Sequence, residues 1–260
     1  MHGSITTPGK HSRLWKEWRR AGKGKSDSFF MEHREAVLET LESTSPPAQV
    51  LLASSLYVQD SDFWERLAHR TSSSWYLLED EALEDLLSVR GCSGLCGLYR
   101  PDDRDLDSLL GESFILLTWE IQDPGNLGTI IRSCSGLAGG AVLAIGGCNP
   151  WSSKVARASA GALFRSPVLH LPVTRGEEAL HLLSSAGFSI LAAVPRGGVS
   201  PSRVKWTERD VLLVGNETHG LPQPLVERVV PVTLSMTSET ESLNAGVAAS
   251  LLIYERQRTD

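Results

Sequence analysis

Two segments near the C-terminal end decide the fold: residues 211–221 (VLLVGNETHGL) and residues 234–255 (LSMTSETESLNAGVAASLLIYE). The first opens with an apolar run and stops at a polar loop between Gly215 and Gly220, which predicts a buried strand that ends in a tight loop. A second β-branched run, residues 229–233, follows. From Ser242 onward the apolar residues take the period of a helix, and Ser242 stands where it would cap that helix. The stripe expected on one face of the helix is Leu243, Val247, Ala248, Leu251, Leu252 and Tyr254. Strand ends and a helix start therefore lie close together, and open parallel α/β sheets bind ligands at such a place.

These two segments resemble the second and third motifs of the SpoU (TrmH-like) branch of the SPOUT RNA methyltransferases. The first motif of that family contains an Asn, a Gly and an Arg at close spacing. The matching residues upstream are Asp123, Pro124, Gly125, Asn126, Gly128 and Arg132. Three motifs in the right order and spacing are far more specific than a single glycine-rich loop. The resemblance covers the chain from Phe114 to the C-terminus well and the N-terminal part only weakly.

Length and composition set the outer bounds. The chain has 260 residues, 41% of them hydrophobic and 22% charged, which suits one large or two modest globular domains. No apolar run has the length of a membrane span, and the N-terminus lacks the apolar core of a signal peptide, so we expect a cytoplasmic protein without membrane contact. The four cysteines lack metal-site spacing, which favours buried small residues over a metal site.

Strand and helix patterns alternate in two blocks, which predicts an N-terminal domain over residues 1–100, a polar linker over 101–113 and a second domain over 114–260. In the first block, strands are expected at 50–53 and 75–78 and helices at 33–41, 60–69 and 79–87. In the second, strands are expected at 114–119, 141–145, 168–171, 190–194 and 211–214, with helices at 152–160 and 177–186 and a helix after residues 122–128. This alternation predicts an α/β fold with a mostly parallel sheet and helices on both faces. A deep C-terminal trefoil knot is implied by the resemblance alone.

A basic amphipathic helix is expected from Ser12 to Gly22, close to Lys10. Two interpretations stay open: the helix docks its tryptophans on the domain and its basic residues are merely solvated, or its basic face meets RNA. Residues 29–41 (FFMEHREAVLETL) resemble the start of the RNA substrate-binding domain of many SpoU proteins. His33 stands where the family usually has Gly, which leaves RNA binding by this domain an open point.

The reaction implied by the resemblance is methyl transfer from S-adenosyl-L-methionine to a ribose 2′-hydroxyl of structured RNA. By the same resemblance the catalytic residues are Arg132, Asn126, Glu217 and Asn244. Because arginine is effectively never deprotonated in proteins, we expect Arg132 to hold a phosphate and to stabilise the developing alkoxide. Glu217 would accept the hydroxyl proton or orient Arg132, and Asn126 would fix the loop or the ribose. Helix capping alone would also explain Asn244.

The cofactor-binding residues implied by the resemblance are Gly215, Leu234, Leu243, Ala193, Met236 and Ser242, and no metal is expected. Taken singly, Leu234, Met236 and Leu243 would more simply be core residues. The chain departs from the family at Ser235 and Ser238, where Pro and Gly are usual, and at His219, where a small residue is usual. Ser238 lacks a glycine's access to positive φ, so this loop is expected to be shaped differently. Lys154, Arg157 and Arg165 suggest a phosphate-facing surface, with a solvated basic helix as the alternative.

The leading interpretation is thus an RNA ribose 2′-O-methyltransferase, with ribosomal RNA favoured over transfer RNA. The family usually dimerises through the knot, so we expect a homodimer through the C-terminal domain, with Arg132 reaching the partner's pocket. A noncatalytic RNA-binding protein that retains the fold is the alternative. A nucleotide-binding oxidoreductase is poorly supported, because no strand is followed by GxGxxG spacing.

Overall fold

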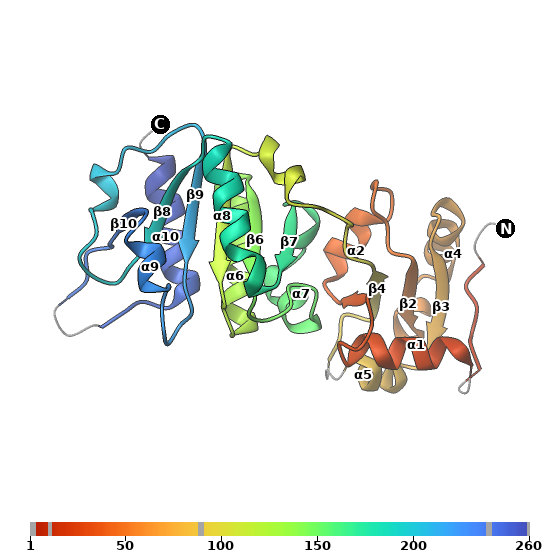
Figure 1. Cartoon of the computed structure of the whole chain (residues 1–260). Coiled ribbons are helices and arrows are strands. Elements are labelled where there is room, and N and C mark those ends of the chain that lie inside the picture. Colours follow the sequence, from red (N-terminus) through yellow and green to blue (C-terminus); the bar gives the residue numbers. More distant parts are fainter. Residues whose placement is uncertain (1–3, 10–11, 88–90, 238–240, 259–260) are drawn as a thin grey trace. The chain divides into compact units, whose positions relative to one another are not determined.

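The computed structural model describes residues 4–9, 12–87, 91–237 and 241–258; Lys10 and Ser238 lie outside them. The chain divides into two compact units, each with its own sheet (Figure 1). Unit 1 comprises Met1–Asp102 and Trp151–Phe164, and unit 2 comprises Asp103–Pro150 and Arg165–Asp260. In the described residues, no helix is long and apolar enough to cross a membrane.

Unit 1 is a four-stranded mixed sheet with the order β1-β4-β2-β3. Its elements are α1 (Arg13–Gly22), β1 (Phe29–Met31), α2 (Arg34–Thr40), β2 (Gln49–Ala53), α3 (Ser54–Tyr57), α4 (Ser61–Arg70), β3 (Ser74–Leu78), α5 (Asp80–Leu87), β4 (Leu95–Tyr99) and α7 (Ser153–Ser159). The β2–β3 pair is parallel, whereas β4 pairs antiparallel with both β1 and β2. The sequence patterns did not predict β1 or β4, because a three-residue strand and a strand that contains Gly97 give weak signals.

The segment 151–164 was assigned from the sequence to the domain over 114–260, but it groups with unit 1. Aromatic rings explain this grouping: Phe29 lies 5.4 Å from Trp151 and Tyr99 lies 4.4 Å from Phe164, measured between ring centroids. Packing of large rings buries much apolar surface in a small area. The connection from β6 to β7 of unit 2 is therefore built into the core of unit 1.

Unit 2 is a six-stranded sheet with the order β10-β8-β9-β5-β6-β7, and all five strand pairs are parallel. Its strands are β5 (Phe114–Trp119), β6 (Ala141–Ile145), β7 (Val168–Leu171), β8 (Ser189–Ala193), β9 (Asp210–Val214) and β10 (Val230–Val232). Its α-helices are α6 (Pro124–Ser133), α8 (Gly176–Ser185), α9 (Gln223–Val226) and α10 (Ala245–Gln257), and a π-helix, η2 (Cys134–Ala138), continues α6. The 3-10 turns of the chain are η1 (Asp107–Gly111), η3 (Ala162–Phe164), η4 (Val173–Arg175) and η5 (Pro201–Arg203), of which η3 lies in unit 1. The predicted parallel α/β sheet is thus confirmed, while the knot stays a prediction.

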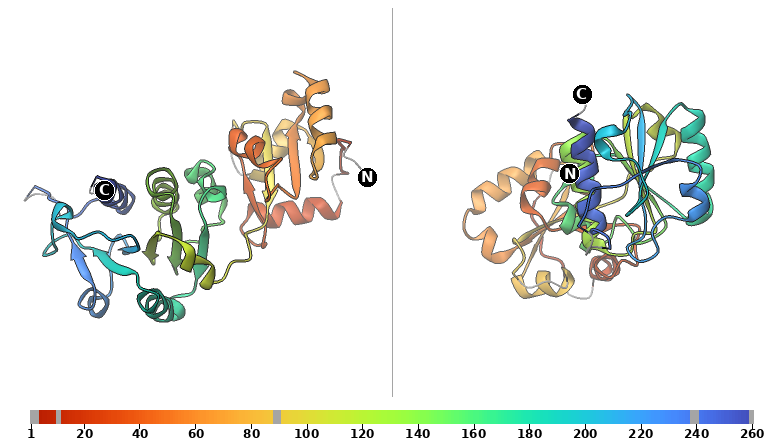
Figure 2. Two further views of the ribbon diagram at one scale, coloured as in Figure 1. Left: turned by 90° about the horizontal axis from the view of Figure 1, so that it is seen from above. Right: turned by 90° about the vertical axis from the view of Figure 1, so that its left-hand side faces the viewer.

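Helices cover both faces of this sheet (Figure 2). On one face, α8 packs its buried Ala179 and Leu183 against alternate strand residues such as Leu117 and Leu213. On the other face, α6 and α10 lie side by side. The predicted linker over 101–113 is only partly a linker, because Leu106 and Leu109 are buried in the core of unit 2. Because this stretch is rich in Asp, the sequence predicted a polar linker and did not indicate that these two leucines are core residues.

The helix α10 differs from its prediction in the face that it buries. Its buried residues are Ala245, Gly246, Ala249, Leu252, Ile253 and Arg256. Three members of the expected stripe are exposed instead: Val247 at 46%, Leu251 at 42% and Tyr254 at 52%. The helix is apolar around most of its circumference, so periodicity alone could not choose the buried side.

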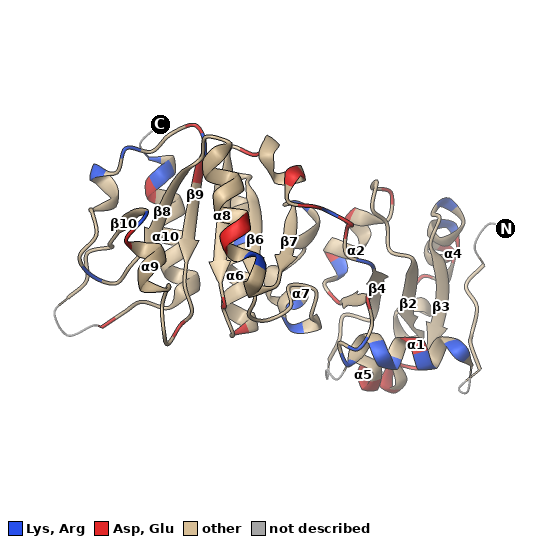
Figure 3. Ribbon diagram, viewed as in Figure 1, with Lys and Arg blue, Asp and Glu red and all other residues tan. Residues whose placement is uncertain are grey.

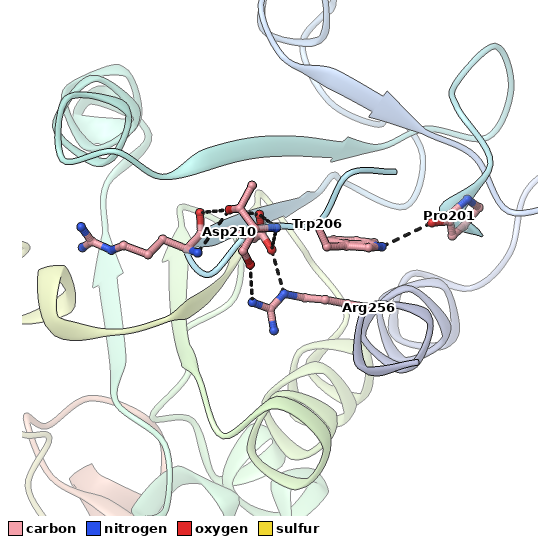
Figure 4. A network of polar contacts seen from close by, with 6 residues as sticks. Pro201, Trp206, Asp210 and Arg256 are labelled. Carbon is pink, nitrogen blue, oxygen red and sulfur yellow. Dashed lines mark hydrogen bonds and ion pairs between the residues drawn. The ribbon is translucent and has the colours of Figure 1, made fainter. Parts of the chain in front are cut away.

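A buried ion pair fixes α10 to the sheet (Figure 4). Nε of Arg256 donates to Oδ2 of Asp210 at 2.8 Å, and Nη2 donates to the carbonyl oxygen of Thr207 at 3.1 Å. Asp210 also accepts hydrogen bonds from the backbone N–H and the hydroxyl of Thr207. The guanidinium lies over the ring of Phe114, 5.0 Å from its centroid. The pair joins the last turns of α10 to the amino end of β9, far along the strand from the motif loops.

Candidate active site

Three predicted cofactor residues lie at one edge of the sheet of unit 2. Ala193 ends β8, Gly215 directly follows β9, and Leu234 comes two residues after β10. The strands are neighbours and parallel, with Val232 opposite Ala193 and Leu213 opposite Ala192. Because parallel strands present their carboxyl ends at the same edge, these residues meet where α/β sheets bind ligands.

The loop after β10 supplies apolar side chains next to this edge. Residues 233–237 and 241–244 belong to no helix or strand. At the two ends of this stretch the N–H of Thr233 donates to the carbonyl oxygen of Val199, and the carbonyl oxygen of Asn244 accepts from the N–H of Ala248. Leu234, Met236 and Leu243 are half-buried, which fits neither a closed core nor a fully solvated surface. Ser235 and Ser242 are exposed. This loop can offer apolar walls and backbone groups to a ligand.

Asn244, and not Ser242, caps α10. Its Oδ1 accepts a hydrogen bond from the backbone N–H of Val247 at 3.2 Å. The prediction that Ser242 caps the helix is therefore wrong. The helix begins at Ala245, two residues after the start that a cap at Ser242 would give. Since capping uses only the oxygen of the Asn244 amide, its nitrogen remains available for a second bond.

That nitrogen begins a hydrogen-bond network that joins all three motifs. Nδ2 of Asn244 donates to Oδ1 of Asn126 at 2.7 Å, and Nδ2 of Asn126 donates to Oε1 of Glu217 at 2.8 Å. Asn126 is buried, while Glu217 and Asn244 reach the surface. An amide that donates to a carboxylate and accepts from another amide has only one consistent orientation. The network therefore fixes the Asn126 side chain between the other two motifs.

Glu217 is held by the loop that precedes α6. Its two carboxylate oxygens accept hydrogen bonds from the backbone N–H groups of Gln122 and Asp123, each at 3.2 Å. Partial burial opposes its charge, but the bonds from Asn126 and from backbone N–H groups outweigh burial and hold the pKa of Glu217 below its ordinary value of 4.5. Glu217 is thus ionised at neutral pH with three of its lone-pair sites occupied.

Arg132 is exposed in the last turn of α6. Within the described residues its guanidinium forms no ion pair with Glu217 and does not join the network that contains Asn126. The structure therefore brings together Asn126, Glu217 and Asn244, but leaves Arg132 at the surface of the same helix. An exposed guanidinium can meet a phosphate without first breaking an internal bond.

Sequence reasoning missed two residues beside the network, Asn216 and Glu120. Nδ2 of Asn216 donates to the carbonyl oxygen of Glu120 at 2.8 Å, which joins the loop after β9 to the loop after β5. Its Oδ1 accepts from the backbone N–H groups of Thr218 and His219. An Asn four residues before a glycine in a loop is a turn signal. That signal could have suggested the bonds from Thr218 and His219, but not the bond to Glu120. The side chain of His219 is exposed.

The four cysteines are free thiols. Burial raises the pKa of Cys134 to about 12 and that of Cys148 to about 11. Cys148 lies in the loop after β6, and its N–H donates to the carbonyl oxygen of Ile121. A thiol with such a pKa is protonated at neutral pH, so Cys148 is not an activated nucleophile.

Basic residues of unit 1 divide into engaged and exposed groups. Arg157 is engaged: its Nη2 lies 3.0 and 2.9 Å from the two carboxylate oxygens of the buried Glu32, while its side chain stays 47% exposed. The phosphate-facing surface expected from the sequence stays a prediction. On α1, Trp18 is fully buried and its Nε1 donates to Oε1 of Gln49 at 2.6 Å. The exposed basic residues of α1 are Arg13, Lys16, Arg19 and Arg20 (Figure 3). The helix thus docks a tryptophan and also presents a basic face.

Comparison with known proteins gives one family and several relatives. The family described as "SpoU rRNA Methylase family" matches residues 113–254. The 23S rRNA (guanosine(2553)-2'-O)-methyltransferase RlmP of Bacillus subtilis is 25% identical over 248 residues, 92% of this chain and 94% of that protein. An uncharacterized tRNA/rRNA methyltransferase of Mycolicibacterium smegmatis is 30% identical over 264 residues, 92% of this chain and 80% of that protein.

Solved structures share the fold over nearly the whole chain. The AdoMet-bound rRNA methyltransferase from Sinorhizobium meliloti superposes with a TM-score of 0.82 at 21% identity, covering 100% of this chain and 99% of that chain. The SpoU methyltransferase AviRb from Streptomyces viridochromogenes, in complex with AdoMet, gives a TM-score of 0.83 at 23% identity, with 96% and 98% covered. These similarities support the arrangement of strands and helices described above.

Proposed function

This chain belongs to the SpoU rRNA Methylase family, as its three motifs predict, and on that premise we propose that it transfers a methyl group from S-adenosyl-L-methionine to a ribose 2′-hydroxyl of RNA. The observation that carries the proposal is the network in which Asn244, Asn126 and Glu217 join the three motifs. The printed name of the Bacillus subtilis relative specifies 2'-O-methylation of ribosomal RNA, which favours ribosomal over transfer RNA as the substrate.

The residues at the sheet edge fit the proposed cofactor. S-adenosyl-L-methionine has apolar and aromatic parts as well as polar groups. The half-buried Leu234, Met236 and Leu243 offer apolar walls for the apolar parts. Gly215, Ala193 and Ser242 would complete the cofactor site with backbone groups and small side chains. When bound, the cofactor supplies an electrophilic sulfonium methyl group. The task of the protein is then mainly to hold the hydroxyl in line and to assist loss of its proton.

We propose different tasks for the polar residues of the network. Glu217 accepts hydrogen bonds from Asn126, Gln122 and Asp123 and has a lowered pKa, so we expect it to orient Asn126 more than to accept the substrate proton. Asn126, held from both sides, would position the ribose. Arg132 would grip the adjacent phosphate and stabilise the developing alkoxide, which suits its exposed position.

Unit 1 is proposed to bind the RNA substrate. The exposed Arg13, Lys16, Arg19 and Arg20 give α1 a basic face, although the whole chain carries a formal net charge of −6. A local basic face is sufficient to contact a phosphate backbone, and such contacts weaken as salt rises. Replacing Arg19 and Arg20 with Gln should therefore weaken RNA binding and flatten its salt dependence, while cofactor binding stays unchanged.

We propose a homodimer that forms through α10. Val247, Leu251 and Tyr254 recur at helical spacing and are exposed, and Leu137 on the adjoining η2 is 42% exposed. A contiguous apolar face of this kind on a protein surface is typical of an interaction site. The family resemblance favours a second copy of the chain as the occupant, with Arg132 serving the partner's site.

The first experiment is calorimetric titration with S-adenosyl-L-methionine of the wild type and of Leu243→Arg. A charged side chain at Leu243 should abolish binding, while the control Val58→Arg, at an exposed position of unit 1, should bind as the wild type does. Absence of wild-type binding at millimolar ligand, with RNA absent and then present, would refute the proposal. It would favour the noncatalytic RNA-binding protein instead.

The second experiment follows the methyl group itself. Ribosomal and transfer RNA are incubated with methyl-labelled cofactor and digested to nucleosides, and the label is expected on a 2′-O-methyl nucleoside from ribosomal RNA. Arg132→Lys keeps the charge but loses the planar fork, so turnover should fall while cofactor binding is retained. Label on a base, or full turnover by Arg132→Lys, would contradict the proposed chemistry.

A further inference from the structure

The backbone of the loop after β5 is left-handed at Glu120, where φ is +53°. Among the described residues only one other non-glycine residue, Ala160, has a positive φ. A side chain at Cβ makes this conformation unfavourable, and residues held in it cluster at functional sites where the surroundings fix them. Glu120 lies two residues before Gln122, the first of the two N–H donors to Glu217.

Contacts from two neighbouring loops hold this turn. Nδ2 of Asn216 binds the carbonyl oxygen of Glu120 at 2.8 Å from the loop after β9. From the loop after β6, the N–H of Cys148 donates to the carbonyl oxygen of Ile121 at 2.8 Å. Gly147 approaches so closely that a Cβ atom there would lie 2.2 Å from the same carbonyl oxygen. Neither loop can move away without releasing the turn.

The Asn216 amide has a fixed orientation. Its Oδ1 accepts from the N–H groups of Thr218 at 2.8 Å and His219 at 3.0 Å. The backbone carbonyl oxygen of Asn216 accepts a hydrogen bond from the N–H of Gly220 at 2.9 Å, which closes the turn. Because two backbone donors face the amide oxygen, the amide nitrogen must face Glu120.

We propose that Asn216 is a positioning residue that, by binding the Glu120 carbonyl oxygen, holds the left-handed turn and thereby aims the Gln122 and Asp123 N–H groups at Glu217. Asn216 itself touches no reacting atom. Loss of its amide nitrogen would let the turn relax, withdraw the two N–H donors from Glu217, and loosen the Asn126 side chain that Glu217 holds. The kinetic part of this inference rests on the proposed function, whereas the structural part does not.

The test uses Asn216→Ser, Glu120→Gly and the double variant. Serine can retain the turn through its hydroxyl but cannot reach Glu120, and glycine adopts positive φ without strain. The structural readout is the pKa of Glu217, followed by carboxyl carbon NMR and assigned with Glu217→Gln. We expect the Glu217 pKa to rise toward 4.5 in Asn216→Ser and to return to the wild-type value in the double variant. If Asn216→Ser does not fold, Asn216→Thr, whose hydroxyl also can retain the turn without reaching Glu120, carries the same test and adds no charge beside Glu217.

The kinetic readout is methyl transfer, where kcat of Asn216→Ser should fall about 10- to 100-fold with KM for the cofactor within about twofold. The Glu120→Gly substitution should recover most of this loss. An unchanged Glu217 pKa in Asn216→Ser, or a raised pKa that Glu120→Gly does not restore, would overturn the inference. Absence of methyl transfer by the wild type would instead count against the proposed function, and the NMR readout would still decide the role of Asn216.

Discussion

Removal of the buried guanidinium of Arg256 is expected to destabilise unit 2 without altering the motif loops. In Arg256→Met the methionine fills a similar volume but leaves the carboxylate of Asp210, which is fully buried, without its charged partner. The pair lies at the amino end of β9, whereas Gly215 and the motif loop that it opens lie beyond the carboxyl end of the same strand. Stability and ligand binding should therefore respond differently.

The size of the destabilisation depends on the hydrogen bonds that Asp210 retains in Arg256→Met. Breaking a buried ion pair by removing one partner costs about 3–5 kcal/mol. Asp210 still accepts bonds from the Thr207 N–H at 3.1 Å and from its hydroxyl at 2.7 Å, so the loss should be about 3 kcal/mol. For a chain of this size each kcal/mol lowers Tm by about 2–4 °C, which gives a decrease of about 6–12 °C.

Differential scanning calorimetry measures the decrease, and hydrogen exchange of β9 and α10 amides assigns it to unit 2. The matched control is Arg258→Met on the same helix end, since Arg258 is 62% exposed and pairs with Glu255 at the surface. Exposed pairs contribute about 0–1 kcal/mol, so the control should shift Tm only slightly. Equal shifts in the two variants would refute the reasoning, as would a loss of S-adenosyl-L-methionine binding by folded Arg256→Met.

Three further outcomes test the network and the proposed dimer face of α10. Because hydrogen bonds lower the folded-state pKa of Glu217, its carboxylate stabilises the fold above about pH 4.5, and this contribution is lost as the pH falls through the lower folded pKa. The stability difference between wild type and Glu217→Gln, from urea titrations at several pH values, should thus shrink in acid, and a constant difference would contradict this. Asn244→Asp and Asn244→Ala both lose the bond to Asn126 and should lose kcat, but only Asn244→Asp keeps the helix cap, so Asn244→Ala should be the less stable of the two by about 1 kcal/mol; equal stability of the two would argue against capping. Leu251→Asp should convert a dimer to a monomer in light scattering, while Val58→Asp should not; a Leu251→Asp dimer would exclude this face.

Local apolar runs determined the strands of unit 2. The bounds expected for the strands at 114–119, 141–145 and 168–171 are those of β5, β6 and β7. Buried parallel strands are continuous apolar runs between turn residues, and that signal is contained in the run itself. The same reasoning gave the helix near residue 245 but not its cap, because Ser242 and Asn244 are both good capping residues and only the course of the chain selects between them.

The site itself divides in the same way. Sequence motifs placed Asn126, Glu217 and Asn244 in three separate segments of the chain, and the structure joined them through two hydrogen bonds. The loop expected over residues 122–128 is partly wrong, because α6 begins at Pro124 and Asn126 lies in its first turn. Which donor meets which acceptor depends on the strand order and on the path of each loop, and neither is contained in local sequence. Asn216 shows the limit most clearly, since its turn-forming role is local and its bond to Glu120 spans 96 positions of the chain.

The sequence by itself determined the alternation of strands and helices, the family and the positions of its motifs, because each depends on side chains close together in the chain. The tertiary structure alone decided the strand order, the membership of residues 151–164 in unit 1 and the buried side of α10. It also decided that Arg256 is buried, whereas a charged residue would be expected at the surface from the sequence alone. Such choices depend on which distant surfaces meet and how their polar groups are satisfied, so only the folded chain could settle them.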